Sequence, residues 1–234
     1  MADDRVLIIT GASSGIGAAT ARHAAAAGMS LVLAARSDDK LQALASEVGE
    51  DRALTVRTDV MQWEDNERLV QAALERFGRI DIVFANAGFG ATRGFLEESP
   101  EHWRSMVLTN VYGVALTIRA TLPHLLERGD GHFLVTSSVA GRRALPGSLY
   151  SATKWAATAI GESLRAELRQ MHENHAIKMT LIEPGMVDTP FFDNRPGKWA
   201  LQDGDIARAV MYALEQPGNV DVNEILIRPT SQPI

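Results

Sequence analysis

Short apolar runs alternate with longer amphipathic stretches along this 234-residue chain. A short apolar run is typical of a buried strand, whereas apolar residues that recur every three or four positions are typical of a helix. Mostly apolar runs predict strands at residues 6–9, 31–34, 54–56, 80–84, 132–136, 178–182 and 224–227. Helical periodicity, with glycine or capping residues at several ends, predicts helices at residues 16–27, 37–48, 64–77, 101–128, 149–172 and 205–215.

The order of these elements predicts the fold class. Strands that alternate with helices and are apolar on both faces are typical of a parallel sheet that is covered on both sides. We therefore expect an α/β fold with a doubly wound parallel sheet of about seven strands and helices on both faces. No linker, repeat or low-complexity segment divides residues 1–234, which favours a single domain. The irregular segment at about 186–202 is long enough to be functional, and we expect it to cover a binding site.

Composition and charge exclude several classes of function. The net charge is −6 and no basic run is present, so neither nucleic acid nor an anionic membrane is an expected partner. The chain has no cysteine, which excludes disulfides and thiolate chemistry, and its 6 histidines lack the spacing of a metal site. No signal peptide and no apolar span of about 18 residues is visible, so a cytoplasmic location is the default expectation.

A glycine-rich turn, Thr10-Gly11-Ala12-Ser13-Ser14-Gly15-Ile16-Gly17, lies between the first predicted strand and the first predicted helix. Glycines at such a turn allow a tight bend, a close approach of main-chain N–H groups to a pyrophosphate, and close contact between helix and strand. The amino end of the helix then faces the anion. This placement predicts a dinucleotide-binding loop, although the spacing Gly-x-x-x-Gly-x-Gly differs from the better-known Gly-x-Gly-x-x-Gly.

The same turn also fits Gly-x-Ser-x-Gly, the nucleophile elbow of serine hydrolases, with Ser13 as the nucleophile. An elbow of that kind lies deep in a sheet, after strands that supply the oxyanion-hole loop. No strand precedes the turn here, so the dinucleotide loop is favoured over the hydrolase elbow.

Arg36 follows the second predicted strand, at about the distance from the glycines where nicotinamide-binding folds contact the adenosine ribose. An acidic residue at this place favours NAD, and an arginine favours the 2′-phosphate of NADP. The nearby Asp38 and Asp39 are better explained as favourable charges in the first turn of a helix. Arg36 therefore predicts NADP(H) over NAD(H), with a solvated surface arginine as the alternative.

Tyr150 and Lys154 are four residues apart in a predicted helix, so they lie on one face about one turn apart. A tyrosine normally loses its proton only near pH ~10. A neighbouring ammonium group stabilises the phenolate, which would lower the pKa of Tyr150 and allow acid–base catalysis near neutrality. The alternative is a packed tyrosine with its lysine in solvent.

Taken together with five further motifs, these features resemble the short-chain dehydrogenase/reductase family over essentially the whole chain. The motifs are the glycine-rich turn, Asp59-Val60, Asn86-Ala87-Gly88, Asn110, Ser138 with Gly141 three residues later, Tyr150 with Lys154, and Pro184-Gly185 followed by Thr189. The family usually has Asn-Asn-Ala-Gly at the third motif, and Ala85 replaces its first Asn here. NADP-dependent 3-hydroxy-acid or serine dehydrogenases and clavulanate-type aldehyde reductases have a similar carboxyl-terminal segment, Glu224 to Thr230.

The resemblance implies a Rossmann fold that binds NADP(H) and transfers hydride between the nicotinamide and a carbonyl or secondary alcohol. The implied catalytic residues are Asn110, Ser138, Tyr150 as general acid/base, and Lys154. Asp59 and Val60 would contact the adenine, and Asn86 would hold the central strands together. The implied cofactor-binding residues are Gly11, Ser13, Ser14, Gly15, Ile16, Gly17, Arg36, Asp59, Val60, Asn86, Ala87, Gly88, Tyr150, Lys154, Pro184, Gly185, Val187 and Thr189.

Asn110 falls within a predicted helix, where asparagine is unfavourable. The resemblance implies a local helix irregularity at this residue, and the alternative is a tolerated surface asparagine. In the implied mechanism Ser138 stabilises the substrate oxygen. Ser137 more simply satisfies main-chain groups.

The expected substrate pocket combines residues near the catalytic motifs with the covering segment. Its expected residues are Phe89, Ala140, Leu145, Met186, Phe191, Phe192 and Trp199. The aromatic side chains suggest an apolar carbonyl substrate, or they only pack the covering segment. Arg142, Arg143 and Arg195 are either binders of a substrate carboxylate or solvated arginines.

The leading hypothesis from the sequence is thus an NADP(H)-dependent carbonyl reductase or alcohol dehydrogenase. A nucleotide-sensing regulator without catalysis is a second hypothesis, and the intact Tyr150–Lys154 pair argues against it. The family resemblance also implies a homo-oligomer, most often a homotetramer.

Overall fold

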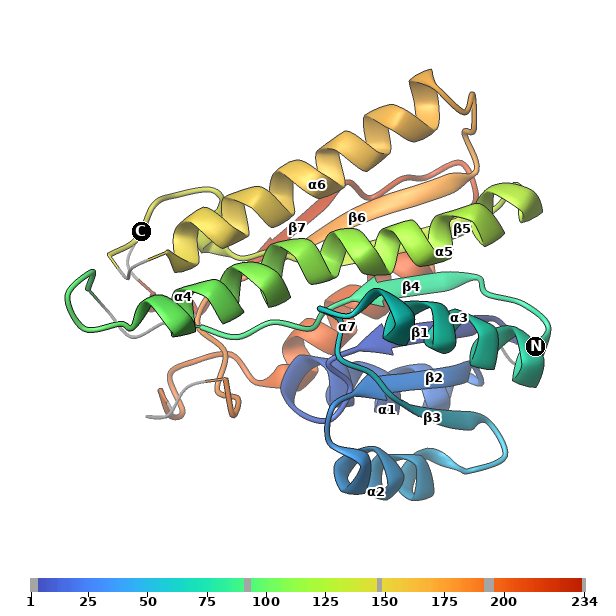
Figure 1. Cartoon of the computed structure of the whole chain (residues 1–234), viewed down its shortest axis with the longest axis horizontal. Coiled ribbons are helices and arrows are strands. Elements are labelled where there is room, and N and C mark those ends of the chain that lie inside the picture. The colour runs from blue at the N-terminus through green and yellow to red at the C-terminus, as the bar shows by residue number, and fades with distance from the viewer. Residues whose placement is uncertain (1–3, 91–93, 147–148, 192–195, 233–234) are drawn as a thin grey trace.

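The computed structural model describes residues 4–90, 94–146, 149–191 and 196–232. Seven parallel strands form one sheet in the order β3-β2-β1-β4-β5-β6-β7 (Figure 1). This confirms the expected doubly wound parallel sheet. The strands are β1 Val6–Thr10, β2 Ser30–Ala35, β3 Ala53–Arg57, β4 Ile82–Ala85, β5 Gly131–Thr136, β6 Ile177–Pro184 and β7 Glu224–Ile227.

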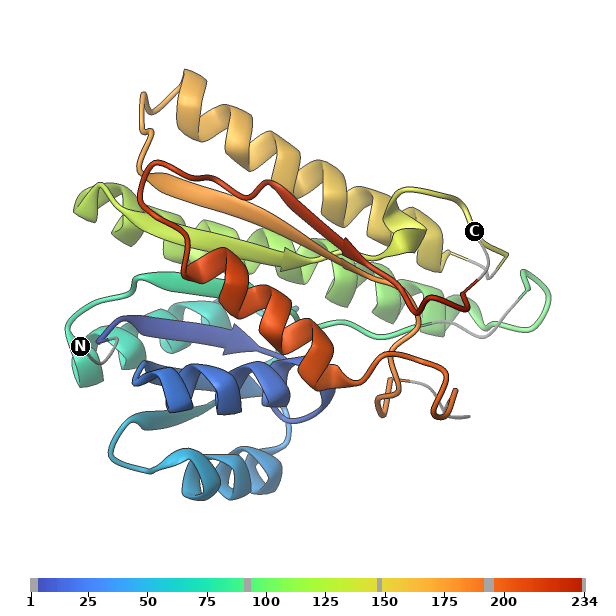
Figure 2. The same ribbon diagram turned by 180° about the vertical axis from the view of Figure 1, so that it is seen from behind.

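Helices cover both faces of the sheet. The helices α1, α2 and α7 lie on one face, which is turned toward the viewer in Figure 2, and α3, α5 and α6 lie on the other (Figure 1). Their bounds are α1 Gly15–Ala27, α2 Asp38–Val48, α3 Trp63–Phe77, α4 Pro100–Val107, α5 Val114–Arg128, α6 Tyr150–Gln170 and α7 Asp203–Leu214. Within the described residues, no helix is sufficiently long and apolar to span a membrane.

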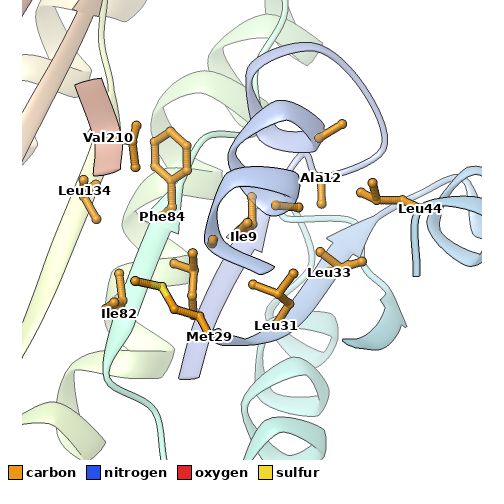
Figure 3. Close-up of a cluster of buried hydrophobic side chains, with 14 of the residues drawn as sticks. Ile9, Ala12, Met29, Leu31, Leu33, Leu44, Ile82, Phe84, Leu134 and Val210 are labelled. Atoms are coloured by element: carbon orange, nitrogen blue, oxygen red, sulfur yellow. The ribbon is translucent and has the colours of Figure 1, made fainter. Parts of the chain in front are cut away.

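Alternate residues of β1 show why its apolar run is continuous. Leu7 and Ile9 point into one hydrophobic core, whereas Val6 and Ile8 point into the core on the opposite face. Figure 3 shows Ile9 in the first core. Because successive side chains of a strand point to opposite faces, a strand that is covered on both sides must be apolar at every position.

One predicted helix is interrupted in the structure at a candidate site residue. The expected helix at residues 101–128 is divided into α4 and α5 by a π-helical turn, η1, at Leu108–Gly113. Asn110 lies in this turn. A π-turn inserted between α-helices is frequent at functional sites. The other predicted helices and strands are present, and their ends differ from the prediction by a few residues.

The sheet order places the candidate site residues at one edge of the sheet. The strand order reverses between β1 and β4, because the chain first builds outward to β3 and then returns to the other side of β1. A crevice forms at such a switch point, outside the carboxyl ends of the strands, and ligands bind there in open α/β sheets. The predicted motifs follow the carboxyl ends of β1, β4, β5 and β6.

Candidate active site

The glycine-rich turn after β1 has no room for side chains at its contact points. A Cβ atom on Gly17 would overlap the carbonyl oxygen of Gly11, and one on Gly11 would lie 2.9 Å from Cα of Ala87. Gly11 also has a φ of +68°, a conformation that strongly favours glycine. The glycine-rich turn therefore packs closely against the segment that follows β4. Because its glycines have no side chains, the main-chain atoms of the turn are exposed to a ligand.

The amino end of α1 has free hydrogen-bonding capacity. Ser14 precedes the helix in an extended conformation, and within the described residues its side chain makes no capping hydrogen bond. The first N–H groups of a helix lack partners inside the helix, so they are available to an anion. Thr189 packs against this turn, because a Cβ atom on Gly15 would lie 3.2 Å from Cβ of Thr189. The residues present therefore fit a pyrophosphate.

Asn86 connects the carboxyl ends of three strands. Its Nδ2 donates to the Thr10 carbonyl at 3.2 Å, and its Oδ1 accepts from the Thr136 hydroxyl at 2.9 Å. The Thr10 hydroxyl also accepts the main-chain N–H of Asn86 at 3.0 Å. These bonds join β1, β4 and β5 at the edge where the ligand crevice lies.

Asn110 is buried and holds the segment that follows β4. Its Oδ1 accepts the N–H of Phe89 at 3.0 Å, and its Nδ2 donates to the Phe89 carbonyl at 2.9 Å. Nδ2 also lies 3.2 Å from the Thr153 hydroxyl, one residue before Lys154. The alternative of a surface asparagine is therefore wrong, because Asn110 is only 1% exposed.

Tyr150 and Lys154 lie in the first turns of α6, and the lysine ammonium is 5.9 Å from the centre of the tyrosine ring. Lys154 Nζ donates to the Thr136 carbonyl at 2.9 Å. Burial disfavours the ammonium form and lowers the pKa of Lys154 to about 8. The lysine is thus inside the protein, and the alternative of a solvated lysine is wrong.

The pKa of Tyr150 differs from the expectation. Burial disfavours the phenolate and raises the pKa to about 12, while a hydrogen bond with the Ser138 hydroxyl lowers it in part. The expected lowering by Lys154 is not seen, because desolvation of the phenol dominates. In this structure Tyr150 is therefore a protonated phenol, hydrogen-bonded to Ser138, at neutral pH.

The two serines after β5 have different environments. Ser138 Oγ accepts the N–H of Ala140 at 3.1 Å and lies 3.3 Å from the Pro184 carbonyl, in addition to its bond with Tyr150. Ser137 Oγ donates to the Lys154 carbonyl at 3.1 Å and lies 2.7 Å from the Thr158 hydroxyl. Ser138 faces the tyrosine, whereas Ser137 joins β5 to α6.

Phe191 is an expected pocket residue that contacts the ring of Tyr150. Its ring meets the Tyr150 ring edge-on, with centroids 5.7 Å apart. The ring also packs on Gly90, where a Cβ atom would lie 2.7 Å from Phe191 Cε1. Phe89, held by Asn110, contacts His102 edge-on at 5.2 Å. We refer to Phe191, which contacts Tyr150, and to Phe89, whose neighbour Gly90 packs on Phe191, as the aromatic wall.

The other expected pocket residues have varied positions. Ala140 is buried, whereas Leu145 and Trp199 are 41% and 48% exposed. Met186 donates its main-chain N–H to Gln232 Oε1 at 2.8 Å, a contact with the carboxyl-terminal segment that no local sequence pattern indicated. The side chain of Val187 is in the first hydrophobic core, so only its main chain is available to a ligand. Phe192 and Arg195 lie outside the described residues.

Arg142 does not have a free guanidinium group. Its Nε lies 2.7 Å from Glu183 Oε1, and its Nη2 lies 2.7 Å from Glu224 Oε2. The hypothesis that Arg142 binds a substrate carboxylate is therefore not supported by its geometry. Arg143 is exposed.

Charged side chains line a pocket at the ends of β2 and β3. The pocket has a volume of about 260 Å³ and is lined by Arg36, Arg57, Asp59, Asp65 and Arg68. Sequence reasoning missed Arg57 and Arg68. Strand pairing places Arg57 directly opposite Ala35, which explains why two arginines that are distant in the sequence share one pocket. A larger hollow of about 440 Å³, between α3 and α5, contains none of the predicted site residues.

The acids of this pocket are engaged by other groups. Asp65 Oδ2 accepts the N–H of Asp59 at 2.8 Å, and Oδ1 pairs with Arg68 at 2.8 Å. Burial raises the pKa of Asp65, but this hydrogen bond, Arg68 and the charge of Arg57 outweigh burial, so the pKa is lowered overall. Neither Arg36 nor Arg57 donates a side-chain hydrogen bond within the described part of the chain. Both remain available to an anion.

Known proteins with similar sequences are oxidoreductases. The sequence profile of the family described as short chain dehydrogenase matches residues 5–198. An uncharacterized oxidoreductase of Listeria monocytogenes is 39% identical over 245 residues, which cover 98% of each chain. Another, from Staphylococcus haemolyticus, is 42% identical over 228 residues, covering 96% of this chain and 97% of the relative.

Three solved structures with a similar fold contain nicotinamide cofactors. An alcohol dehydrogenase of Thermococcus sibiricus in complex with 5-hydroxy-NADP has a TM-score of 0.90 and 36% identity, with 99% of both chains covered. A serine dehydrogenase with NADP+ has a TM-score of 0.91 and 28% identity, covering 98% of this chain and 96% of that one. A Burkholderia phymatum relative with NAD has a TM-score of 0.86 and 30% identity, covering 96% of this chain and 89% of that one.

Proposed function

The chain belongs to the short-chain dehydrogenase family, and we propose that it is an NADP(H)-dependent oxidoreductase acting on a carbonyl or secondary alcohol. The observation that carries this proposal is the group formed by Tyr150 with the buried Ser138 and Lys154, at the edge of the sheet where the glycine-rich turn lies. A phenol, a hydroxyl that bonds to it and a buried amine are the groups needed to handle one proton at a substrate oxygen.

The residues that would hold the cofactor lie along the switch-point crevice. The turn Gly11–Gly17 and the amino end of α1 would bind the pyrophosphate, and Asp59 with Val60 would contact the adenine. The segments Asn86–Gly88 and Pro184–Thr189 would flank the nicotinamide half, with Lys154 at its ribose. When bound, the nicotinamide supplies the hydride for reduction or accepts it for oxidation.

The protein's own residues supply the proton. In the direction of reduction, Tyr150 donates its phenolic proton to the carbonyl oxygen, which becomes the alcohol hydroxyl. Burial keeps the phenol protonated at neutral pH, so the proton to be donated is in place before the reaction. Ser138 binds the same oxygen, and the proton is replaced from solvent through Lys154, whose pKa burial lowers to about 8.

The preference for NADP(H) is supported by the arginines around the pocket at the ends of β2 and β3. Arg36 and Arg57 are free to bind a 2′-phosphate, while Asp65 is occupied by Arg68 and by a main-chain N–H. A phosphate monoester carries nearly two charges, so guanidinium groups favour it over the neutral 2′-hydroxyl of NAD.

An apolar carbonyl compound is the substrate class that fits the site best. Phe191, which contacts Tyr150, and Phe89 make up the aromatic wall, and the loop at 186–202 is the proposed cover. Arg142 is not free to bind a substrate carboxylate, because its guanidinium pairs with Glu183. Apolar ketones and aldehydes are therefore expected to react better than 3-oxo acids.

The assay that tests the function follows NADPH absorbance with a panel of apolar ketones, aldehydes and 3-oxo acids, and repeats it with NADH. Oxidation of NADPH by an apolar carbonyl compound supports the proposal. Binding of NADPH without turnover of any compound would instead indicate a nucleotide-sensing protein. Ester cleavage without a cofactor would indicate a hydrolase that uses Ser13.

The proposed protein is a homo-oligomer. Val107, Tyr112 and Trp155 are large apolar residues that are 40%, 49% and 48% exposed, respectively. They lie on α4, η1 and α6, on one side of the sheet. A second copy would bury them, and multi-angle light scattering would measure the assembly. A monomer at micromolar concentration would contradict this part of the proposal.

A further inference from the structure

Arg142 ties the catalytic-serine turn to two strands. It directly follows the short 3-10 turn η2, Val139–Gly141, which begins after Ser138. Its guanidinium lies between Glu183 on β6 and Glu224 on the edge strand β7, at 2.7 Å from each carboxylate. The Glu183 side chain is completely buried, so this ion pair anchors the turn inside the protein.

The opposite side of the same turn is held by α6. A Cβ atom on Gly141 would lie 2.8 Å from the Lys154 carbonyl and 2.8 Å from the Thr158 hydroxyl, so the turn packs directly on the catalytic helix. Glu183 immediately precedes Pro184, whose carbonyl lies 3.3 Å from Ser138 Oγ. Contacts with α6 on one side and with β6 on the other thus hold Ser138 in place.

We propose that Arg142 is a positioning residue that keeps the Ser138 hydroxyl in contact with Tyr150, by fastening the serine turn to β6 and β7. The proposal rests on the proposed function only in that Ser138 and Tyr150 act on the same substrate oxygen. Arg142 itself touches no reacting atom. The segment that it fastens lies between the two catalytic residues in the sequence, so a shift of the turn changes their separation.

Electrostatics explains why the anchor is an arginine. Burial raises the pKa of Glu183, and Arg142 opposes that shift through a hydrogen bond and its charge, with a smaller contribution from Thr158. Glu224 raises the pKa of Glu183 and faces the same guanidinium. Removing Arg142 would leave Glu183 buried without a counter-charge, and its carboxylate would have to move or take up a proton.

Arg169 offers a matched control. It pairs with Asp221 at 3.0 Å and donates to the carbonyls of Asn174 and Ile177, so it also ties α6 to the β6–β7 region. Its side chain is 25% exposed, compared with 32% for Arg142. It lies near the carboxyl end of α6, away from the candidate active site. Arg169→Met therefore removes a comparable anchor without touching the serine turn.

The experiment compares Arg142→Met, Arg142→Lys and Arg169→Met with the parent protein by two readouts. The chain has 3 tyrosines, so protein labelled with ¹³C at tyrosine Cζ gives few resonances, and Tyr150→Phe identifies that of Tyr150. The Cζ resonance reports the hydrogen bond at the phenol and needs neither cofactor nor substrate. The second readout is kcat and KM for NADPH oxidation.

We expect the Tyr150 resonance to move in Arg142→Met, to move less in Arg142→Lys and to stay in place in Arg169→Met. We expect kcat of Arg142→Met to fall about 10- to 100-fold, the range for a misplaced catalytic group, with the KM for NADPH within about twofold. An unmoved Tyr150 resonance in both Arg142 variants would overturn the proposal, as would an equal loss of kcat in Arg169→Met. Absence of turnover in the parent protein would overturn the proposed function, and the resonance would still decide the role of Arg142.

Discussion

The side chain of Asn110 pairs with both main-chain groups of Phe89, accepting its N–H at 3.0 Å and donating to its carbonyl at 2.9 Å. The π-helical turn presents this amide toward the segment after β4, at the base of the aromatic wall. One buried side chain therefore holds two main-chain groups that would otherwise lack partners.

Asn110→Ala is expected to lower the free energy of unfolding by about 1–3 kcal/mol, because it leaves the partly buried N–H and carbonyl of Phe89 without the Asn110 amide. Urea denaturation measures the loss. Asn223→Ala, at an exposed position, is the control and should change stability by less than about 0.5 kcal/mol. Equal stability of the two variants would mean that water replaces the Asn110 amide.

Tyr150→Phe is expected to reduce kcat at least about 10²-fold, because it removes the proposed general acid. NADPH binding, measured by fluorescence titration, should be retained. Tyr212→Phe is the matched control, since Tyr212 is 56% exposed on α7 and should keep full activity. A fully active Tyr150→Phe enzyme would exclude the mechanism.

Arg36→Ala and Arg57→Ala are each expected to lower kcat/KM for NADPH relative to NADH by about 10-fold or more, the effect of losing a hydrogen bond to a charged group. The ratio of the two cofactors is the readout, because a general loss of folding lowers both values equally. Arg104→Ala, on the exposed side of α4, should leave the ratio unchanged. If only Arg57→Ala keeps the parent ratio, Arg36 alone recognises the phosphate.

His132 is expected to make the protein sensitive to acid. Burial lowers its pKa from 6.5 to about 3, with further lowering by Lys178 and Arg5, and its ring bonds the Thr180 hydroxyl at 2.7 Å. Between pH 6.5 and about 3 the unfolded state binds a proton that the folded state does not. Stability contributed by neutral His132 is therefore present above pH 6.5 and is lost as the pH falls, by about 1.4 kcal/mol per pH unit.

Urea denaturation at several pH values between 6.5 and 4 checks this slope. His132→Gln cannot take up the proton, so its stability should depend less steeply on pH than that of the parent protein. His175→Gln, at an exposed position, should keep the parent slope. Parallel slopes for all three proteins would show that His132 is not the group responsible.

The sequence by itself determined the features that depend on local order. The alternation of apolar and amphipathic segments predicted the parallel sheet, because side chains alternate along a strand and recur every third or fourth residue along a helix. The glycine-rich turn and the Tyr150–Lys154 spacing could also be identified from the sequence, since each feature lies within a few consecutive residues.

Only the tertiary structure decided which distant residues meet and how burial changes their chemistry. Arg142 pairs with Glu183, 41 residues away, and Arg57 reaches the pocket of Arg36 because β3 pairs with β2. Gln232 holds Met186 from the carboxyl-terminal segment. The spacing of Tyr150 and Lys154 suggested a lowered tyrosine pKa, yet burial raises it to about 12. Desolvation and strand order are properties of the folded chain, and no local pattern contains them.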